Sequence, residues 1–196
     1  IIIFDGMRYD AWKYIVEPHF EAALSERDTK YKSSYALLPS ITSISRKAIY
    51  DNIIKNYKDD INYIVKSESA KNEQLLKESI LQDKKINIFV FNMFDRDGHK
   101  ATEDFYIFYD KQKQVFEKSI DELINAIPND ANLLIAPDHG LMRIDENINL
   151  NGQKYVTTVK SRYLTVNDKV KKDGFINIKA YMLSYAHKGS FVAGGE

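Results

Sequence analysis

The sequence contains the stretch Ile1-Ile2-Ile3-Phe4-Asp5, a fully apolar run that ends at an acidic residue. Such a run is typical of a central parallel strand that is covered on both faces. Two later apolar runs, residues 86–91 and 133–135, also lead to aspartates, Asp95 and Asp138. In an open α/β sheet, the loops past the carboxyl ends of parallel strands gather around one crevice. We therefore expect the three aspartates to lie near one another.

Histidines accompany two of these aspartates. His99 follows Asp95 by four residues, and His139 follows Asp138 directly. Carboxylates and imidazoles are the ligands expected for Zn²⁺ or a related divalent ion. Each motif alone also has a structural interpretation, because Asp-Gly after a strand is often only a turn. Taken together, the motifs predict a metal site.

Length and composition limit the classes of protein to consider. A chain of 196 residues can bury one core, so we expect a single domain over residues 1–196. Lys plus Arg equals Asp plus Glu, 28 against 28, which leaves no overall field for nucleic acid or an anionic membrane. The absence of cysteine excludes disulfides and Cys-ligated zinc.

Two further expectations concern location and completeness. No apolar stretch approaches the ~20 residues of a membrane span, and no signal-peptide pattern is present. We therefore expect a soluble, cytoplasmic protein with no membrane partner. The first residue already lies in a strand-like run and the last follows Gly194-Gly195, so we interpret the chain as a piece of a longer protein that lacks its C-terminal end.

Strand and helix patterns alternate through the first two thirds of the chain. Strands are predicted at residues 1–4, 61–65, 86–91 and 132–136, and helices at residues 10–24, 72–81 and 104–127 and from Thr42 or Ser43 onward. Pro18 should kink or split the first helix. Residues 155–166 and 181–185 read as further strands, the former near a sheet edge. The alternation predicts an α/β fold with a mostly parallel central sheet and helices on both faces.

The helix that begins near Thr42 places hydroxyl groups at a helix N-terminus. Unpaired backbone N–H groups and the helix dipole favour an anion there. Plain capping is the structural alternative, because Ser and Thr commonly cap helices. Arg46 lies four residues beyond Thr42 on the same face, where it can reach a phosphate oxygen or point to solvent.

Four motifs in this order resemble the PglZ domain, a branch of the alkaline phosphatase superfamily that occurs in phage-defence systems such as BREX and beside response-regulator receivers. The motifs cover residues 4–12, 38–46, 95–99 and 138–140. The resemblance implies an alkaline-phosphatase-like core and two divalent metal ions, Zn²⁺ or alternatively Mn²⁺. Two such ions can clamp the attacking and departing oxygens of a phosphoryl transfer.

The resemblance also implies roles for individual residues. Asp5, Thr42, Asp138 and His139 would surround one ion, and Asp95 and His99 would hold the other. Thr42 would be the catalytic nucleophile and form a phospho-threonine intermediate, with Ser40 and Ser43 as rival nucleophiles. Arg46 would bind substrate; the further candidates for a phosphate contact are Arg8, Lys160 and Arg162.

The implied activity is metal-dependent hydrolysis of phosphate esters. We expect a phosphodiesterase that acts on nucleotides or nucleic acid rather than a monoesterase, because the motifs occur in this order and residues 154–179 are locally basic. Protein partners or flanking domains of a defence or signalling system are implied as well. The sequence departs from the superfamily in one respect: the late histidine ligand of the second ion would have to lie beyond Glu196 or be replaced by His187.

Other classes are less well supported. A haloacid-dehalogenase-type phosphatase needs a second aspartate two residues after the first, where this chain has Met7. A Rossmann dinucleotide-binding protein needs Gly-x-Gly-x-x-Gly after the first strand, which is absent. The remaining alternative is a catalytically inactive, metal-stabilised scaffold of a defence or signalling complex.

Overall fold

The computed structural model describes residues 1–37, 40–57, 61–66, 86–141, 156–159, 163–167, 175–178 and 183–186. Contacts divide the chain into two compact units, Ile1–Leu141 and Met142–Glu196, and each is described by itself. The expectation of a single domain over residues 1–196 stays a prediction. The helix predicted at residues 72–81 lies outside the described residues.

The first unit is built on a sheet of four parallel strands. These strands are β1 (Ile2–Phe4), β2 (Ile61–Lys66), β3 (Ile86–Phe91) and β4 (Ile135–Pro137), in the spatial order β2-β3-β1-β4. All three pairings are parallel. The sequence prediction of an α/β fold with a parallel sheet is therefore confirmed, although the fourth strand begins at Ile135 rather than near residue 132.

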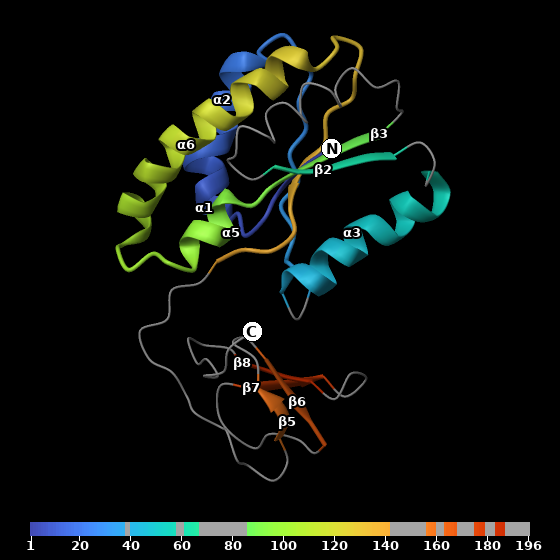
Figure 1. Ribbon diagram of the computed structural model, residues 1–196, viewed down its shortest axis with the longest axis vertical. Helices are drawn as coiled ribbons and strands as arrows, with labels where there is room; N and C mark the ends of the chain where they lie inside the picture. The colour runs from blue at the N-terminus through green and yellow to red at the C-terminus, as the bar shows by residue number, and fades with distance from the viewer. Residues whose placement is uncertain are drawn as a thin grey trace. The chain divides into compact units, whose positions relative to one another are not determined.

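Helices cover both faces of this sheet (Figure 1). Ile2 and Phe4 point to one face, where they pack in a core with buried residues of α2 (Glu17–Ala23) and α6 (Phe105–Ala126). Ile3 points to the other face, where Ile49 and Ile53 of α3 (Thr42–Tyr57) pack against it. Successive residues of a strand face opposite ways, so the apolar run of β1 needs cover on both sides.

The first helical segment contains a π-helical turn. It runs from α1 (Tyr9–Ala11) through the π-helix η1 (Trp12–Val16) into α2. Pro18 is the second residue of α2, and proline has no N–H to donate to the preceding turn. The predicted disturbance at Pro18 is thus a change of helix type within one segment. None of the helices in the described part of the chain combines the length and apolar character that a membrane span requires.

The second unit contains an antiparallel sheet. Its strands are β5 (Val156–Val159), β6 (Tyr163–Val166), β7 (Phe175–Ile178) and β8 (Leu183–Ala186), in the order β5-β6-β8-β7. The patterns at residues 155–166 and 181–185 correspond to β5, β6 and β8, while β7 was not predicted. These strands form a sheet of their own and do not extend the parallel one.

Phe4 is the residue on which we expect the core of the first unit to depend most. Its ring is fully buried and contacts the rings of Phe91, Phe94 and Phe116 at centroid distances of 5.4, 6.0 and 5.5 Å. Phe4→Ala should lower the free energy of unfolding by about 3–5 kcal/mol, because it leaves a cavity among these rings. Urea unfolding followed by circular dichroism measures the change.

Tyr106→Ala is the control, because this aromatic side chain is 77% exposed on α6. It should change stability by less than about 0.5 kcal/mol. Equal losses in the two variants would contradict the placement of Phe4 at the centre of the core.

Candidate metal centre

The register of the parallel strands places two carboxylates side by side. Phe4 pairs with Phe91 of β3 and with Pro137 of β4, so the three strands end at the same level. The residues that follow β1 and β4 are Asp5 and Asp138, and both are buried. Their closeness results from strand pairing and was expected from the sequence.

Asp95 reaches the same place from a short helix. It lies in α5 (Met93–Gly98), whereas the sequence placed it in a loop after the strand. Its N–H donates a hydrogen bond of 3.1 Å to the carbonyl oxygen of Asp5, which ties the first turn of α5 to the end of β1. Gly6 makes this approach possible: its φ is +73°, and a Cβ at this position would lie 2.9 Å from the Cβ of Asp95.

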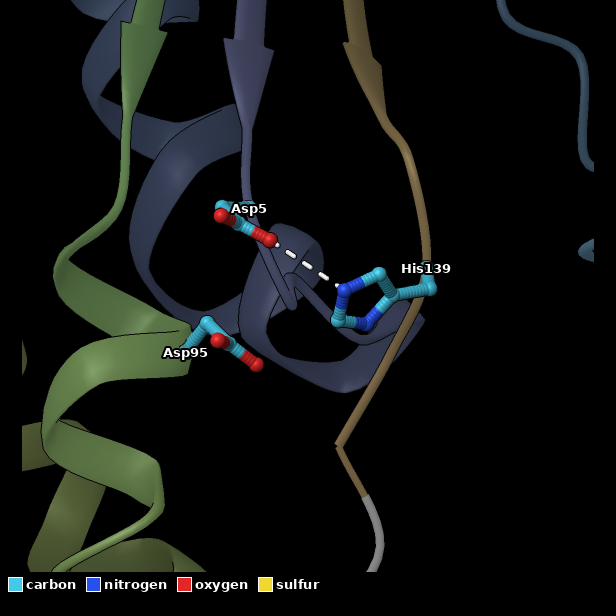
Figure 2. A group of neighbouring side chains, drawn as sticks. All are labelled: Asp5, Asp95 and His139. Atoms are coloured by element: carbon cyan, nitrogen blue, oxygen red, sulfur yellow. Dashed lines mark ion pairs between the residues drawn. The ribbon is translucent and has the colours of Figure 1, made fainter. Parts of the chain in front are cut away.

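Asp5, Asp95 and His139 form a group that can hold one metal ion (Figure 2). One ligand atom from each lies within 4.8 Å of the other two, and Figure 2 shows the three side chains pointing toward a common space. Zinc bonds of about 2.0–2.2 Å limit the separation of its nitrogen and oxygen ligands to roughly 4.4 Å, which a small side-chain movement would reach. Two carboxylates and an imidazole therefore fit a divalent cation.

His139 presents the correct nitrogen for a ligand. Its Nδ1 lies 3.1 Å from the carbonyl oxygen of Gly140. A carbonyl oxygen only accepts hydrogen bonds, so Nδ1 carries a proton, and Nε2 is the nitrogen that is left to bind a metal ion. Metal-binding histidines commonly donate their second ring N–H to a backbone carbonyl in this way. Nε2 faces Asp5, at 3.2 Å from Oδ1.

Thr42 brings its hydroxyl to the same nitrogen. Its Oγ1 lies 2.8 Å from Nε2 of His139 and donates to Oδ1 of Asp5 at 3.3 Å. Helix α3 begins at Thr42, and the carbonyl oxygen of Ile41 accepts the first helical hydrogen bonds, from Ile44 and Ser45. Among the rival nucleophiles, Ser43 is exposed and Ser40 is half-buried. The hydroxyl of Thr42 thus lies at the N-terminus of α3 and contacts two of the three candidate ligands, Asp5 and His139.

The arrangement differs from a Ser-His-Asp triad. In a triad, the carboxylate accepts a hydrogen bond from Nδ1–H and leaves Nε2 to the nucleophile. Here Asp5 and Thr42 both lie on the Nε2 side, and Nδ1 contacts a backbone carbonyl. The hydroxyl and the carboxylate thus converge on the one ring nitrogen that can bind a cation.

Asp138 forms hydrogen bonds with the residues around the group of three ligands. Its Oδ1 accepts hydrogen bonds from the backbone N–H of His139 at 2.8 Å and of Gly6 at 3.3 Å. Its Oδ2 accepts two hydrogen bonds from Arg46, at 3.0 and 2.8 Å. Asp138 is 3.9 Å from Nε2 of His139 and does not belong to the group of three ligands. Its role as a direct ligand stays a prediction.

Arg46 also forms an ion pair with Asp5. Burial by itself would raise the pKa of the Asp5 carboxyl, but hydrogen bonds and charges from His139 and Arg46 lower the pKa below its usual value. Burial alone would lower the pKa of Arg46, and the bonds and charges of Asp5 and Asp138 raise the pKa instead. The sequence left open whether Arg46 faces the site or solvent, and the structure places it in the site.

Of the other predicted residues, His99 and Arg8 are not members of the group of three ligands, and three lie outside the described residues. His99 forms an ion pair with Asp95 at 3.3 Å on α5, and its side chain is 55% exposed. Arg8 pairs with Asp10 and lies over the ring of Phe105. Lys160, Arg162 and His187 are outside the described residues.

Two features of the site were not predicted from the sequence. One is Gly6, whose left-handed backbone admits Asp95; the Asp-Gly pair after a strand was the available signal, but it indicated only a turn. The other is Arg46 as the partner of two acidic residues, for which no local signal exists because Asp5 and Asp138 are 41 and 92 residues away.

No protein-family model matches this sequence, and no curated protein matches it.

Asp95→Asn should weaken metal binding by at least about 100-fold, because it removes one of three ligand groups. Loss of an outer partner of a metal ligand already costs about 10- to 100-fold in affinity. Isothermal titration with Zn²⁺ and Mn²⁺ measures the effect. Asp97→Asn is the matched control, since Asp97 lies on the same helix but pairs with Arg96 and Gln112. If the two variants bind equally well, Asp95 is not a ligand.

Gly6→Ala should reduce both stability and metal affinity. A left-handed backbone costs a residue with a Cβ about 1–2 kcal/mol, and the new methyl group would displace Asp95. Gly140→Ala is the control, because its Cβ would lie 3.3 Å from the flexible side chain of Arg8 and at an ordinary contact distance of 3.8 Å from the Cα of Arg8. Thermal unfolding and metal titration of both variants test the prediction, and an unaffected Gly6→Ala protein would refute it.

Proposed function

We propose that this chain is a metal-dependent hydrolase of phosphate esters, with a site of the alkaline phosphatase type. The single observation that carries the proposal is the position of the Thr42 hydroxyl, 2.8 Å from Nε2 of His139 and beside the acidic group of Asp5 and Asp95. A hydroxyl, an imidazole and carboxylates at the N-terminus of a helix are the parts that phosphoryl transfer needs.

The residues would divide the reaction as follows. Thr42 Oγ1 attacks phosphorus, a Thr42–phosphorus bond forms, and the bond to the leaving alcohol breaks. The hydroxyl proton passes to water, because Nε2 of His139 and Oδ1 of Asp5, which contact Oγ1, would both be occupied by the ion. The departing oxygen takes up a proton from water. Backbone N–H groups at the start of α3 can stabilise the phosphoryl oxygens. A divalent ion held by Asp5, Asp95 and His139 supplies Lewis-acid stabilisation of the developing charge. Water then hydrolyses the phospho-threonine.

The second ion of the two-metal arrangement is part of the proposal. Asp95 and His99, already paired at 3.3 Å, would supply two of its ligands. A late histidine, either His187 or a residue beyond Glu196, would supply the third. Zn²⁺ is the proposed metal because imidazole is among the ligands, and Mn²⁺ suits the carboxylates.

The proposed substrates are phosphodiesters of nucleotides or nucleic acid. The locally basic stretch at residues 154–179 supports an anionic substrate in a chain whose total charge is balanced. The order of the four motifs supports the PglZ domain and, with it, a cytoplasmic role in phage defence or two-component signalling beside flanking domains or protein partners.

An inactive scaffold is the second candidate function. The observation that favours it is the bridge from Arg46 to Asp5 and Asp138, through which protein groups alone compensate the carboxylate charge. A domain of this kind would bind metal for stability and bind partners without turnover.

Thr42→Ala should lower the rate of hydrolysis of nitrophenyl phosphate mono- or diesters by at least about 10³-fold, because it removes the proposed nucleophile. Metal content, measured by elemental analysis, should stay unchanged, since Asp5, Asp95 and His139 are intact. Thr42→Ser is the matched control and should retain part of the activity, because it keeps a hydroxyl. Full activity in Thr42→Ala would reject the nucleophile assignment.

The wild-type chain separates the two candidate functions in the same assay. Metal binding together with hydrolysis that a chelator abolishes supports the enzyme. Metal binding without hydrolysis of either ester class supports the scaffold.

A further inference from the structure

Arg46 is placed between two buried carboxylates of the site. Its guanidinium contacts Oδ2 of Asp5 and Oδ2 of Asp138, and only 16% of its side chain is exposed. The side chains of Asp5 and Asp138 are 9% and 0% exposed. A positive charge that is buried with two negative charges at hydrogen-bond distance interacts strongly with both.

Asp5 is shared between this guanidinium and the metal group. Its Oδ2 contacts Arg46, while its Oδ1 faces His139 Nε2 at 3.2 Å and the Thr42 hydroxyl at 3.3 Å. If a cation binds Oδ1 while the guanidinium stays at Oδ2, both positive charges contact the same carboxylate group, that of Asp5. Two positive charges at such short range in a buried site repel each other far more than they would in water.

Asp138 has no hydrogen-bonding capacity to spare for a cation while Arg46 is in place. Its Oδ1 accepts from two backbone N–H groups, and its Oδ2 accepts from both Nε and a terminal nitrogen of Arg46. A role for Asp138 as a metal ligand therefore requires that the Arg46 hydrogen bonds to Oδ2 give way.

We propose that Arg46 and a divalent cation compete for the negative charge of Asp5 and Asp138, so that this guanidinium sets the metal affinity of the site and is released from the carboxylates when the ion binds. The inference rests on the proposed function only for the existence of the metal centre. The proposal also accommodates the substrate contact expected for Arg46 from the sequence. A guanidinium that leaves Asp5 and Asp138 becomes available to a phosphoryl oxygen.

A supporting role for Arg46 would have the opposite consequence. If Arg46 only positioned Asp5 as a ligand, its removal would disorder the carboxylate and weaken metal binding. If it competes with the ion, its removal leaves Asp5 and Asp138 with uncompensated charge and tightens metal binding. The sign of the change in affinity therefore distinguishes the two roles.

The test is the dissociation constant of Zn²⁺, and separately of Mn²⁺, for the full chain and three variants. Arg46→Gln should bind at least about tenfold more tightly than the wild-type chain, which corresponds to about 1.4 kcal/mol. Arg46→Lys keeps the charge but lacks the two-pronged geometry, so its affinity should lie between those of the wild-type chain and Arg46→Gln.

Lys47→Gln is the matched control and should bind within about twofold of the wild-type chain. It removes one positive charge from the next residue of α3, where Lys47 pairs with Asp51 at the surface.

Thermal unfolding provides a second readout. Metal-free Arg46→Gln should melt below the wild-type chain, because two buried carboxylates lose their counter-charge. Added Zn²⁺ should raise its melting temperature by more than it raises that of the wild-type chain. If metal-free Arg46→Gln does not fold, it is purified with Zn²⁺ and its affinity is taken from competition with a chelator.

The outcomes separate this inference from the proposed function. Equal or weaker metal binding by Arg46→Gln, beside a wild-type chain that binds metal, overturns the competition and leaves the proposed function intact. Tighter binding by Arg46→Gln, with no hydrolysis by the wild-type chain, supports the competition and overturns the proposed function. Absence of metal binding in the wild-type chain and in both Arg46 variants overturns both.

Discussion

Backbone hydrogen bonds hold β1 between β3 and β4. Their register pairs Phe4, the last residue of β1, with Phe91 and Pro137, the last residues of β3 and β4. The position of Asp5 beside Asp138 depends on this pairing. The register is fixed by burial, because Ile2 and Phe4 pack under α2 and α6 while Ile3 packs under α3. A shift by one residue would exchange the two faces of β1 and turn every side chain to the opposite layer. The core therefore positions the carboxylates as well as stabilising the fold.

Two carboxylates that are buried close together repel each other unless neighbouring groups compensate their charge. Asp5 and Asp138 are buried, and burial disfavours their charged forms. Arg46 and His139 compensate by hydrogen bonds and charge, so that the pKa of Asp5 lies below its usual value in spite of burial. The same concentration of negative charge makes the site suitable for a divalent cation. In the competition that we propose, compensation by Arg46 and compensation by a metal ion are alternatives at Asp5 and Asp138.

Elements from both faces of the sheet contribute to the site. Asp95 comes from α5, whose residues Met93 and Phe94 pack in the core under α2 and α6, whereas Thr42 and Arg46 come from α3 on the opposite face. They meet because the first turns of α3 and α5 both lie at the carboxyl ends of the strands, where Thr42 contacts Asp5 and Asp95 donates to it. A helix N-terminus there offers unpaired N–H groups and a favourable dipole to an anion.

Local patterns in the amino-acid sequence were enough to predict the parallel α/β class, the strands and helices with the strongest periodicity, and the convergence of Asp5, Asp95 and Asp138. These follow from local apolar patterns and from the rule that strand ends share one edge. The sequence did not determine that Asp95 lies in a helix, that Gly6 admits it, or that β7 forms. The contact of His139 Nε2 with Thr42 and the bridge of Arg46 to Asp5 and Asp138 became known from the folded structure. These contacts join residues 37 to 97 positions apart, and the directions of their side chains depend on packing that no local sequence pattern records.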